Sequence, residues 1–387
     1  MGTGSPLEAR VRARLDEWRD AGLLRTLQAP AGVDLSSNDY LSLSRDPRVI
    51  ERMAEAAVRD GCGSTGSRLL RGQRDAFSAL EARFARFKGT ERSLYFSSGY
   101  LANIAVMTAM TERGDVIFSD ERNHASLIDG ICLSSAARVV FPHNDAVALE
   151  RLLHQTPCGG HRVIVVESLF SMDGDLAPLG EYAALCRSTG ATLVVDEAHA
   201  VGIYGPRGSG LVEAAGVDAD VCLTVNTAGK ALGVAGAFVN GPAWAIDYLI
   251  QHARPFVFST APPPALAAAI EASLDIVADE PARRECLAAR VRLLRTKLTT
   301  AGIIDAGGTS QIIPVVLGDN DRAVAVARTL QADGFDVRAI RPPSVPDGSA
   351  RLRISVNAGL SEAIVERFAD ALVNAVREVG VCSAGSS

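Results

Sequence analysis

The amino-acid sequence lacks the apolar runs of a membrane protein, because none of its hydrophobic stretches is long enough to span a bilayer. It also lacks Cys-x-x-Cys pairs, and its seven scattered cysteines are odd in number, which argues against a disulfide framework. The first residues contain no apolar signal core, and Pro6 stands where a myristoylation motif needs Ser or Thr. These absences predict a soluble protein of the reducing cytoplasm.

An excess of positive charge is missing as well. The formal net charge is −6 and the arginines are interspersed with Asp and Glu, so we expect neither nucleic acid nor an anionic membrane as a partner. The sequence has no internal repeats and no low-complexity tracts. It does have 387 residues, of which 48% are hydrophobic, and this predicts two folded units with a large core.

Short apolar runs alternate with helix-sized intervals in the middle of the chain. The runs lie at residues 94–96, 116–118, 139–141, 163–166, 193–195 and 221–225. Strands this apolar indicate a mostly parallel sheet covered by helices on both faces, which is an α/β fold. We therefore expect residues 41–275 to form a large domain.

Two further regions flank this domain. Residues 1–40 are expected to form an N-terminal helical arm, because residues 7–28 place Leu15, Trp18 and Leu23 at helical spacing. Three consecutive prolines, 262–264, mark the exit from the large domain, and residues 276–387 predict a smaller α+β domain. We expect there a charged helix at 281–300, strands near 312–317, 337–340 and 352–356, a closing helix near 361–378 and a disordered tail at 382–387.

Lys230 lies between the apolar run 221–225 and a glycine-rich stretch, on a turn after a predicted strand. Gly229, Gly233 and Gly236 allow close approach of the backbone and of a cofactor, and a lysine held in such a place can form a Schiff base with an aldehyde. A single lysine in a loop is more often surface. The rest of the chain has to decide between these interpretations.

Asp196 and His199, of the motif D-E-A-H, follow the run 193–195 and therefore come at the carboxyl end of a sheet strand. An aspartate held against a pyridine nitrogen keeps that nitrogen protonated, as a pyridoxal phosphate enzyme requires. The same four letters occur in helicases, which also need a Gly-x-x-x-x-Gly-Lys-Ser/Thr loop. The sequence has no such loop, so the helicase hypothesis is disfavoured.

Other polar residues follow predicted strands at the same edge. Gly99 and Tyr100 begin a helix after the run 94–96, where backbone amides form an anion site, and Thr227 approaches from another strand end. His124 could stack on a flat ring, although a lone histidine in a loop is more often polar surface, and Ser171 could bond a ring hydroxyl. The acidic residues of 167–175 lack calcium-loop spacing, so no metal is expected.

Two more patterns remain open. The stretch 61–66 spells Gly-Cys-Gly-Ser-Thr-Gly, but a charged helix rather than a strand precedes it, so we interpret it as a glycine turn instead of a dinucleotide fingerprint. Arg351 and Arg353 share one face of a predicted strand, and a guanidinium there is suited to bidentate binding of an amino acid carboxylate. Paired arginines on a solvated face are the common alternative.

Five motifs in this order carry a family resemblance: S-S-N-D-Y-L-S-L at 36–43, S-S-G-Y-L-A-N at 97–103, F-S-M-D-G-D at 170–175, D-E-A-H at 196–199 and T-A-G-K at 227–230. With them the chain resembles the α-oxoamine synthases, which are fold type I pyridoxal phosphate enzymes, from about residue 10 to 375. H-N-D at 143–145, G-D-N at 318–320 and A-I-R-P-P-S-V-P at 339–346 resemble most closely the branch that joins L-alanine to a pimeloyl thioester in biotin synthesis.

The resemblance implies a role for each site residue. Lys230 would bind the cofactor aldehyde, Asp196 its pyridinium, His124 its ring face, and Ser171 and His199 its hydroxyl. Gly99, Tyr100 and Thr227 would hold the phosphate, together with Thr260 of a neighbouring subunit, which implies a homodimer with shared active sites. Arg353 would bind the amino acid carboxylate, Arg25 the far end of the acyl substrate, and Asn38 the substrate region. The acyl carrier would be coenzyme A or a carrier protein.

Three departures from the family pattern concern substrate choice. Leu360 follows the Arg-Leu-Arg strand where a histidine is expected, Arg71 replaces a serine after the glycine turn, and Ala228 is smaller than its counterparts beside the lysine. A relative using glycine or serine with another acyl donor therefore stays an alternative. A catalytically silent partner on the same fold is a more distant one, and Lys230 argues against it.

Overall fold

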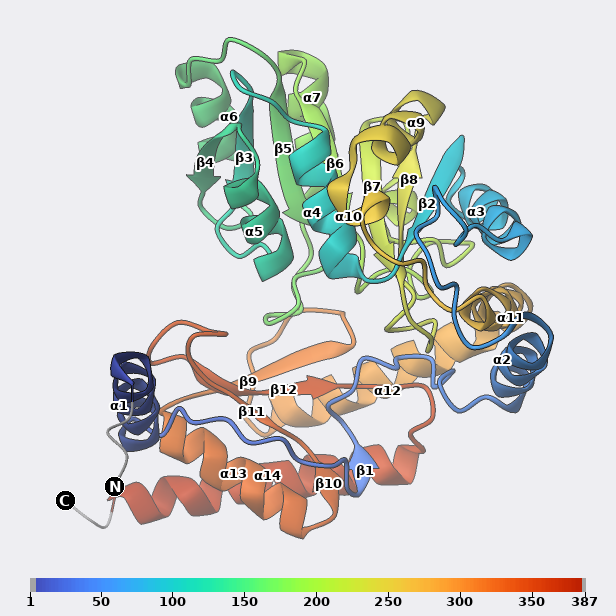
Figure 1. Cartoon of the computed structure of the whole chain (residues 1–387). Coiled ribbons are helices and arrows are strands. Elements are labelled where there is room, and N and C mark those ends of the chain that lie inside the picture. The colour runs from blue at the N-terminus through green and yellow to red at the C-terminus, as the bar shows by residue number, and fades with distance from the viewer. Residues whose placement is uncertain (1–4, 385–387) are drawn as a thin grey trace. The chain divides into compact units, whose positions relative to one another are not determined.

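The computed structural model describes residues 5–384, which form two compact units (Figure 1). The larger unit comprises Asn38–Leu287 and Asn357–Gly359. The smaller unit comprises the residues before Asn38, Ala288–Val356 and the residues from Leu360 onward. The N-terminal segment thus groups with the C-terminal part of the chain.

A seven-stranded sheet forms the centre of the larger unit, in the order β2-β8-β7-β6-β5-β3-β4 (Figure 1). Its strands are β2 (Arg92–Phe96), β3 (Val116–Asp120), β4 (Ala137–Phe141), β5 (Arg162–Glu167), β6 (Thr192–Asp196), β7 (Val221–Thr227) and β8 (Ala237–Gly241). Only β8 runs antiparallel to its neighbours. The predicted mostly parallel sheet is confirmed, and every predicted run in this domain is a strand. β8 was not predicted.

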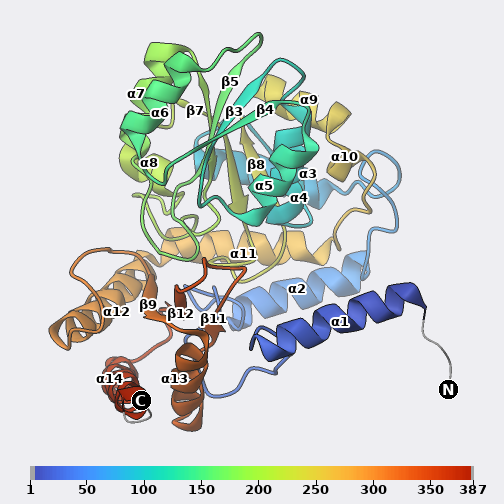
Figure 2. The same ribbon diagram turned by 90° about the vertical axis from the view of Figure 1, so that its left-hand side faces the viewer.

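Helices cover both faces of this sheet, as a parallel sheet requires (Figure 2). One face carries α4 (Gly99–Ala109), α5 (Ala125–Leu133), α9 (Ala243–His252) and α10 (Arg254–Val257), whose apolar residues form one buried cluster with the strands. The other face carries α3 (Asp75–Lys88), α6 (Ala146–Gln155), α7 (Leu179–Thr189) and α8 (Leu211–Ala215). There the Phe84 ring of α3 stacks on Phe238 of β8 at 3.8 Å. α2 (Pro47–Asp60) packs along α11 (Ala265–Asp279).

The strand directions decide where the polar residues meet. β3, β5, β6 and β7 are parallel, and β2 runs the same way because both β2 and β7 are antiparallel to β8. The carboxyl ends of these strands therefore lie at one edge of the sheet. Ligands of open α/β sheets bind at this edge.

The smaller unit contains a three-stranded antiparallel sheet, β11-β12-β9. Its strands are β9 (Ile312–Gly318), β11 (Ala339–Ile340) and β12 (Ala350–Ser355), and a second pair joins β1 (Val33–Asp34) to β10 (Phe335–Asp336). Its helices are α1 (Pro6–Asp20), the C-terminal part of α12 (Pro281–Thr300), α13 (Asn320–Ala332) and α14 (Glu362–Ala384). The predicted α+β character is confirmed.

Two predictions at the ends of the chain are wrong. The opening helix ends at Asp20 instead of residue 28, because Gly22 adopts a left-handed conformation with φ of +66°. α14 continues to Ala384, so the expected disordered tail is wrong for residues 382–384, where no proline interrupts the helical hydrogen bonds. Residues 385–387 lie outside the described part. Among residues 5–384, no helix combines the length and apolarity needed to span a bilayer.

Candidate active site

Lys230 lies in a tight turn between β7 and β8. The Gly233 amide donates to the Lys230 carbonyl at 2.8 Å, and Gly233 has φ of +66°. A Cβ at position 233 would come within 2.4 Å of the Ser44 nitrogen, so only glycine fits there. The turn holds the half-buried Lys230 side chain so that its Nζ lies 2.9 Å from His199 Nε2.

His199 lies between Lys230 and Tyr40. Its Nδ1 is 2.7 Å from the Tyr40 hydroxyl, which itself donates to Asn38 Oδ1 at 2.9 Å. Because the tyrosine proton is directed at Asn38, the tyrosine oxygen accepts from Nδ1–H, which leaves His199 Nε2 as the acceptor facing Lys230. Both rings are buried. The chain Asn38, Tyr40, His199, Lys230 thus fixes one tautomer of the histidine.

Asp196, at the end of β6, is fixed from two directions. Asn103 Nδ2 of α4 donates to its Oδ2 at 2.6 Å, and the Ala198 amide donates to its Oδ1 at 2.8 Å. The same Asn103 amide nitrogen also donates to Ser126 Oγ at 2.8 Å, and Ser126 Oγ lies 2.7 Å from His124 Nδ1. One hydrogen-bond network therefore positions both Asp196 and His124.

Two further groups at this edge have shifted pKa values. Burial lowers the pKa of His124 and outweighs the attraction of Asp196, so the imidazole is neutral at pH 7. Burial also raises the pKa of Glu167 well above its usual value, and the neighbouring Asp196 adds to this shift. Glu167 and Asp196 are register partners on β5 and β6. Of these two neighbouring acids, Glu167 therefore keeps its proton to a higher pH than a free glutamate does.

A cradle of small groups lies where α4 begins. Gly99 opens this helix, and the first amides of a helix have no intrahelical acceptor. A Cβ at Gly99 would meet Thr227 Cβ at 3.8 Å, so the glycine keeps space open beside the threonine. The Gly229 amide donates to Thr227 Oγ1 at 3.1 Å. The Tyr100 hydroxyl, in contrast, is bonded to Asp129.

A buried ion pair holds the D-E-A-H turn from behind. Glu197 Oε2 lies 2.5 Å from Lys88 Nζ, and both side chains are almost fully buried. Glu197 Oε1 accepts from the Val212 amide at 2.9 Å. Removing one partner of such a pair costs about 3–5 kcal/mol, so the turn that carries Asp196 and His199 is strongly held.

The remaining predicted residues have other settings. Ser171 is buried in the loop after β5. Thr260 is exposed between α10 and α11. Among the described residues, none of the Lys230 cluster forms a hydrogen bond with Thr260. Arg353 lies on β12 of the smaller unit, buried, with Nη1 donating to Ser355 Oγ at 2.8 Å. The large unit therefore brings together Gly99, His124, Asp196, His199, Thr227 and Lys230.

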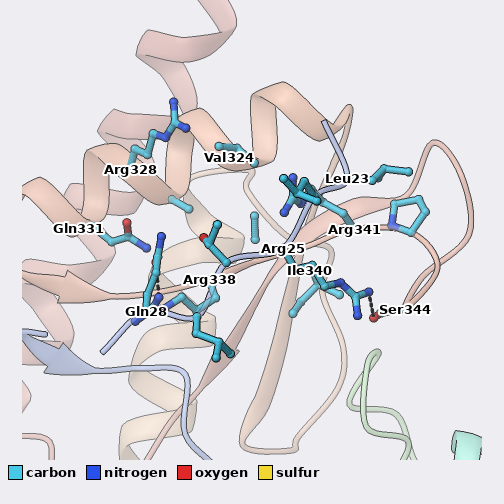
Figure 3. A pocket seen from close by; sticks show the side chains of 16 residues that line it. Leu23, Arg25, Gln28, Val324, Arg328, Gln331, Arg338, Ile340, Arg341 and Ser344 are labelled. Carbon is cyan, nitrogen blue, oxygen red and sulfur yellow. Dashed lines mark hydrogen bonds between the residues drawn. The ribbon is translucent and has the colours of Figure 1, made fainter. Parts of the chain in front are cut away.

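Arg25 lines a groove of about 600 Å³ in the smaller unit (Figure 3). Its Nη2 donates to Ser344 Oγ at 3.1 Å, and Arg341 lies beside it with a hydrogen bond to the Gly22 carbonyl. Within residues 5–384, neither Arg25 nor Arg341 forms an ion pair. Apolar side chains such as Ile340 complete the groove.

These donors match one cofactor. The site fits pyridoxal 5′-phosphate. It offers an amine for the aldehyde, a carboxylate for the pyridine nitrogen and a neutral imidazole for the ring face. Helix amides beside a threonine suit the phosphate, for which Gly99 leaves space. The fold and the site define a fold type I pyridoxal phosphate enzyme.

Comparison with known proteins gives the family. Residues 30–372 match the model of aminotransferase class I and II. The chain is 44% identical to 8-amino-7-oxononanoate synthase of Geobacter sulfurreducens over 96% of this chain and 99% of that protein, and 49% identical to the enzyme of Anaeromyxobacter dehalogenans over 88% and 85%. Serine palmitoyltransferase from S. paucimobilis, solved with PLP bound, superposes with a TM-score of 0.91 at 29% identity, covering 98% of this chain and all of that one.

The chain belongs to the class I and II aminotransferase family and, within it, to the α-oxoamine synthases. It is a PLP-dependent acyltransferase, and its cofactor is pyridoxal 5′-phosphate.

Sequence reasoning missed three residues that the structure places in the site. Tyr40 bonds His199 across 159 positions, Asn103 bonds Asp196 across 93, and Glu167 is buried beside Asp196. Tyr40 and Asn103 stand inside motifs that were recognised, but a motif does not say which distant residue it touches. The apolar run ending before Glu167 was the only local signal for a buried acid.

Proposed function

We propose that this enzyme condenses L-alanine with a pimeloyl thioester to give 8-amino-7-oxononanoate, carbon dioxide and a free thiol, a step of biotin synthesis. The proposal is supported by relatives carrying the name 8-amino-7-oxononanoate synthase at 42–49% identity over most of the chain. The observation that carries the chemistry is the 2.9 Å contact of Lys230 with His199 beside Asp196.

The chain's own residues divide the proton transfers. When bound, PLP supplies the electron sink for the bonds broken at the substrate Cα. The Lys230 amine takes the Cα proton of alanine and later returns one, and His199 Nε2, which lies 2.9 Å from Lys230 Nζ, is placed to accept its proton. A protonated His199 can then donate to the substrate keto oxygen. Asp196 would bind the ring nitrogen of the cofactor and favour its protonated form, and His124 would cover the ring face.

A matrix of substrates tests this reaction. Purified protein is assayed with alanine, glycine or serine, each combined with pimeloyl-CoA, a pimeloyl carrier protein, succinyl-CoA or palmitoyl-CoA. We expect the highest kcat/KM for alanine with a pimeloyl thioester, and the two pimeloyl carriers to differ in KM. The similarity to serine palmitoyltransferase makes serine with palmitoyl-CoA the sharpest rival. Preference for that pair would overturn the proposal.

We propose that Arg25 binds the distal carboxylate of the pimeloyl chain. A carboxylate and a short aliphatic chain suit a groove in which arginines border Ile340 and Val324 (Figure 3). Arg25→Met should raise KM for pimeloyl-CoA about 10- to 150-fold, the value of one hydrogen bond to a charged group. Octanoyl-CoA, which lacks the carboxylate, should be used equally by both proteins.

Arg328 provides the matched control for this prediction, because it lines the same groove from α13. Arg328→Met should leave the KM for pimeloyl-CoA within about twofold. An equal rise of the KM for pimeloyl-CoA in both variants would show a general effect of charge. An equal rise of the KM for octanoyl-CoA in Arg25→Met would likewise contradict a specific contact with the carboxylate. For alanine we propose the corresponding role for Arg353, with Asn38 in the substrate region.

We further propose a homodimer in which Thr260 reaches the cofactor phosphate of the neighbouring subunit. Two segments near Thr260 carry exposed apolar side chains: Phe258, two residues before it, is 72% exposed, and Leu70, four residues after Gly66, is 82% exposed. The Ala261 amide donates to the Gly66 carbonyl at 2.9 Å, which joins the two segments. Sedimentation equilibrium should give twice 40.6 kDa. Mixing inactive Lys230→Ala with Thr260→Val should recover activity, and a monomer with full activity would contradict the proposal.

A further inference from the structure

His143 lies between two carboxylates just beyond β4. Its Nδ1 is 2.9 Å from Asp120 Oδ1, and its Nε2 is 2.5 Å from Asp175 Oδ2. A carboxylate only accepts, and a neutral imidazole has a single N–H. Both hydrogen bonds can form together only when both ring nitrogens carry a proton. With both acids ionised this geometry favours a histidine cation, although Asn144 Nδ2 also lies 3.3 Å from Nε2.

The two carboxylates are themselves held. Asp120 ends β3, is buried, and accepts from the Asn144 amide at 2.9 Å and from the Arg122 amide at 2.8 Å. Asp175 accepts from Asn144 Nδ2 at 2.8 Å. Asn144 adopts a left-handed conformation with φ of +55°, which lets one residue contact both acids. His143 thus binds two preformed acceptors from separate elements.

Asp175 closes the loop that carries Ser171. The Phe170 amide donates to the Asp175 carbonyl at 3.0 Å, and the Gly174 amide donates to the Phe170 carbonyl at 2.9 Å. The His143 ring meets the buried Phe170 ring edge to face, with centroids 4.4 Å apart. His143 therefore touches both ends of the loop. At its other side the loop begins beside Asp196, whose carbonyl accepts from the Ser168 amide at 2.8 Å.

We propose that His143 is a positioning residue of the active site, whose cationic ring ties the loop of residues 170–175 to the ends of β3 and β4 and so fixes Ser171. Its consequence for cofactor binding rests on the role that the family resemblance implies for Ser171 at the cofactor hydroxyl, whereas the attachment of the loop does not. His143 itself contacts neither Lys230 nor Asp196 among the described hydrogen bonds and ion pairs.

The charged surroundings set the direction of its pH dependence. Burial alone would lower the pKa of His143, but the hydrogen bonds to Asp120 and Asp175 outweigh burial and raise the pKa to about 9. Nearby are also Arg122, paired with Asp173, and Asp145 and Tyr182, whose own pKa is raised first by burial and then by these acids. Because the folded pKa exceeds the usual 6.5, the stabilisation is complete below about pH 6.5 and is lost as the pH rises through about 9.

The first experiment observes this proton in the full-length holoenzyme. The chain has six histidines, so ¹³C-labelled imidazoles give few signals in a pH titration. We expect the signal missing in His143→Gln to titrate near pH 9, and Asp175→Asn to lower that midpoint by removing one carboxylate. His154→Gln, on the exposed side of α6, is the matched control. Titration of the His143 signal near 6.5 would overturn the proposal.

The second experiment observes the loop and the cofactor. Amide hydrogen exchange of residues 168–177, corrected for intrinsic rates, should accelerate above pH 9 in the wild type and at every pH in His143→Gln, while the sheet stays protected. The PLP dissociation constant of His143→Gln should rise about tenfold at pH 7, the value of one hydrogen bond, and the alkaline rise of the wild type should be absent. Full loop protection in this variant would overturn the proposal.

Two further outcomes also test the role of His143. If the variant is too unstable to purify, Asp175→Asn and Phe170→Leu release the loop while keeping His143, and they should show the same loop exchange and the same weaker PLP binding. A released loop with an unchanged PLP dissociation constant would overturn the positioning role of His143. It would leave the reaction proposed above untouched, since that reaction is tested by the substrate matrix.

Discussion

Lys230→Ala abolishes the absorbance band at about 420 nm that an imine of PLP gives, and lowers kcat by about 10⁴-fold or more. Two losses combine in this expectation: the covalent link to the cofactor, and the amine that moves the Cα proton. The cofactor should still bind, because Asp196, His124 and Thr227 are held by partners that the substitution does not touch. The purified variant is measured by absorbance and by steady-state assay.

The composition makes this prediction unusually easy to check. The chain contains three lysines, Lys88, Lys230 and Lys297. Lys88 is buried against Glu197, and Lys297 lies in the smaller unit near Asp370, so neither competes for the aldehyde. Borohydride reduction followed by peptide mapping should label position 230, and Lys297→Ala should behave like the wild type. A label on Lys297, or a band at about 420 nm that persists in Lys230→Ala, would refute the assignment.

The sheet was largely predictable because its central strands, such as β3, β5 and β6, are buried on both faces and are therefore mostly apolar. β8 is the instructive exception. It follows Gly233 and Gly236, and the fourth of its five residues is Asn240. Asn240 is fully buried and donates to Asn226 Oδ1 at 2.8 Å. A buried pair of polar side chains inside a sheet breaks the apolar pattern on which strand prediction depends.

The residues of the site could be predicted from the sequence, but the hydrogen bonds that hold them could not. Strand ends identified Asp196, His199 and Lys230 as polar residues at one edge, since parallel strands share a direction. The groups that fix them come from far along the chain: Tyr40 from before the first strand of the sheet, and Asn103 from α4. Such partners depend on tertiary packing alone. The same holds for His143. Its motif gives no role for the histidine, and only the folded chain brings Asp120 and Asp175 to its two ring nitrogens.

Asp196→Asn should lower kcat for the condensation about 10²- to 10³-fold, the usual cost of removing one preorganised electrostatic group. The substitution keeps the shape of the side chain, and the oxygen that accepts from the Ala198 amide can remain in place. The negative charge is lost, and so is the acceptor that Oδ2 offers to Asn103 Nδ2. Without the charge the ring nitrogen is no longer held protonated, so the electron pair left at the substrate Cα is less stabilised. Binding of alanine should change much less than kcat.

Exchange of the alanine Cα proton for deuterium, followed by NMR without an acyl donor, isolates the step that Asp196 supports. We expect this exchange to slow in Asp196→Asn by the same factor as kcat. Asn103→Ala is the matched control, because it removes the 2.6 Å hydrogen bond to Asp196 and leaves the charge, and should cost about tenfold. If Asp196→Asn lost no more than Asn103→Ala, position rather than charge would be the contribution of Asp196. A larger loss in Asp196→Asn identifies the charge as the essential property.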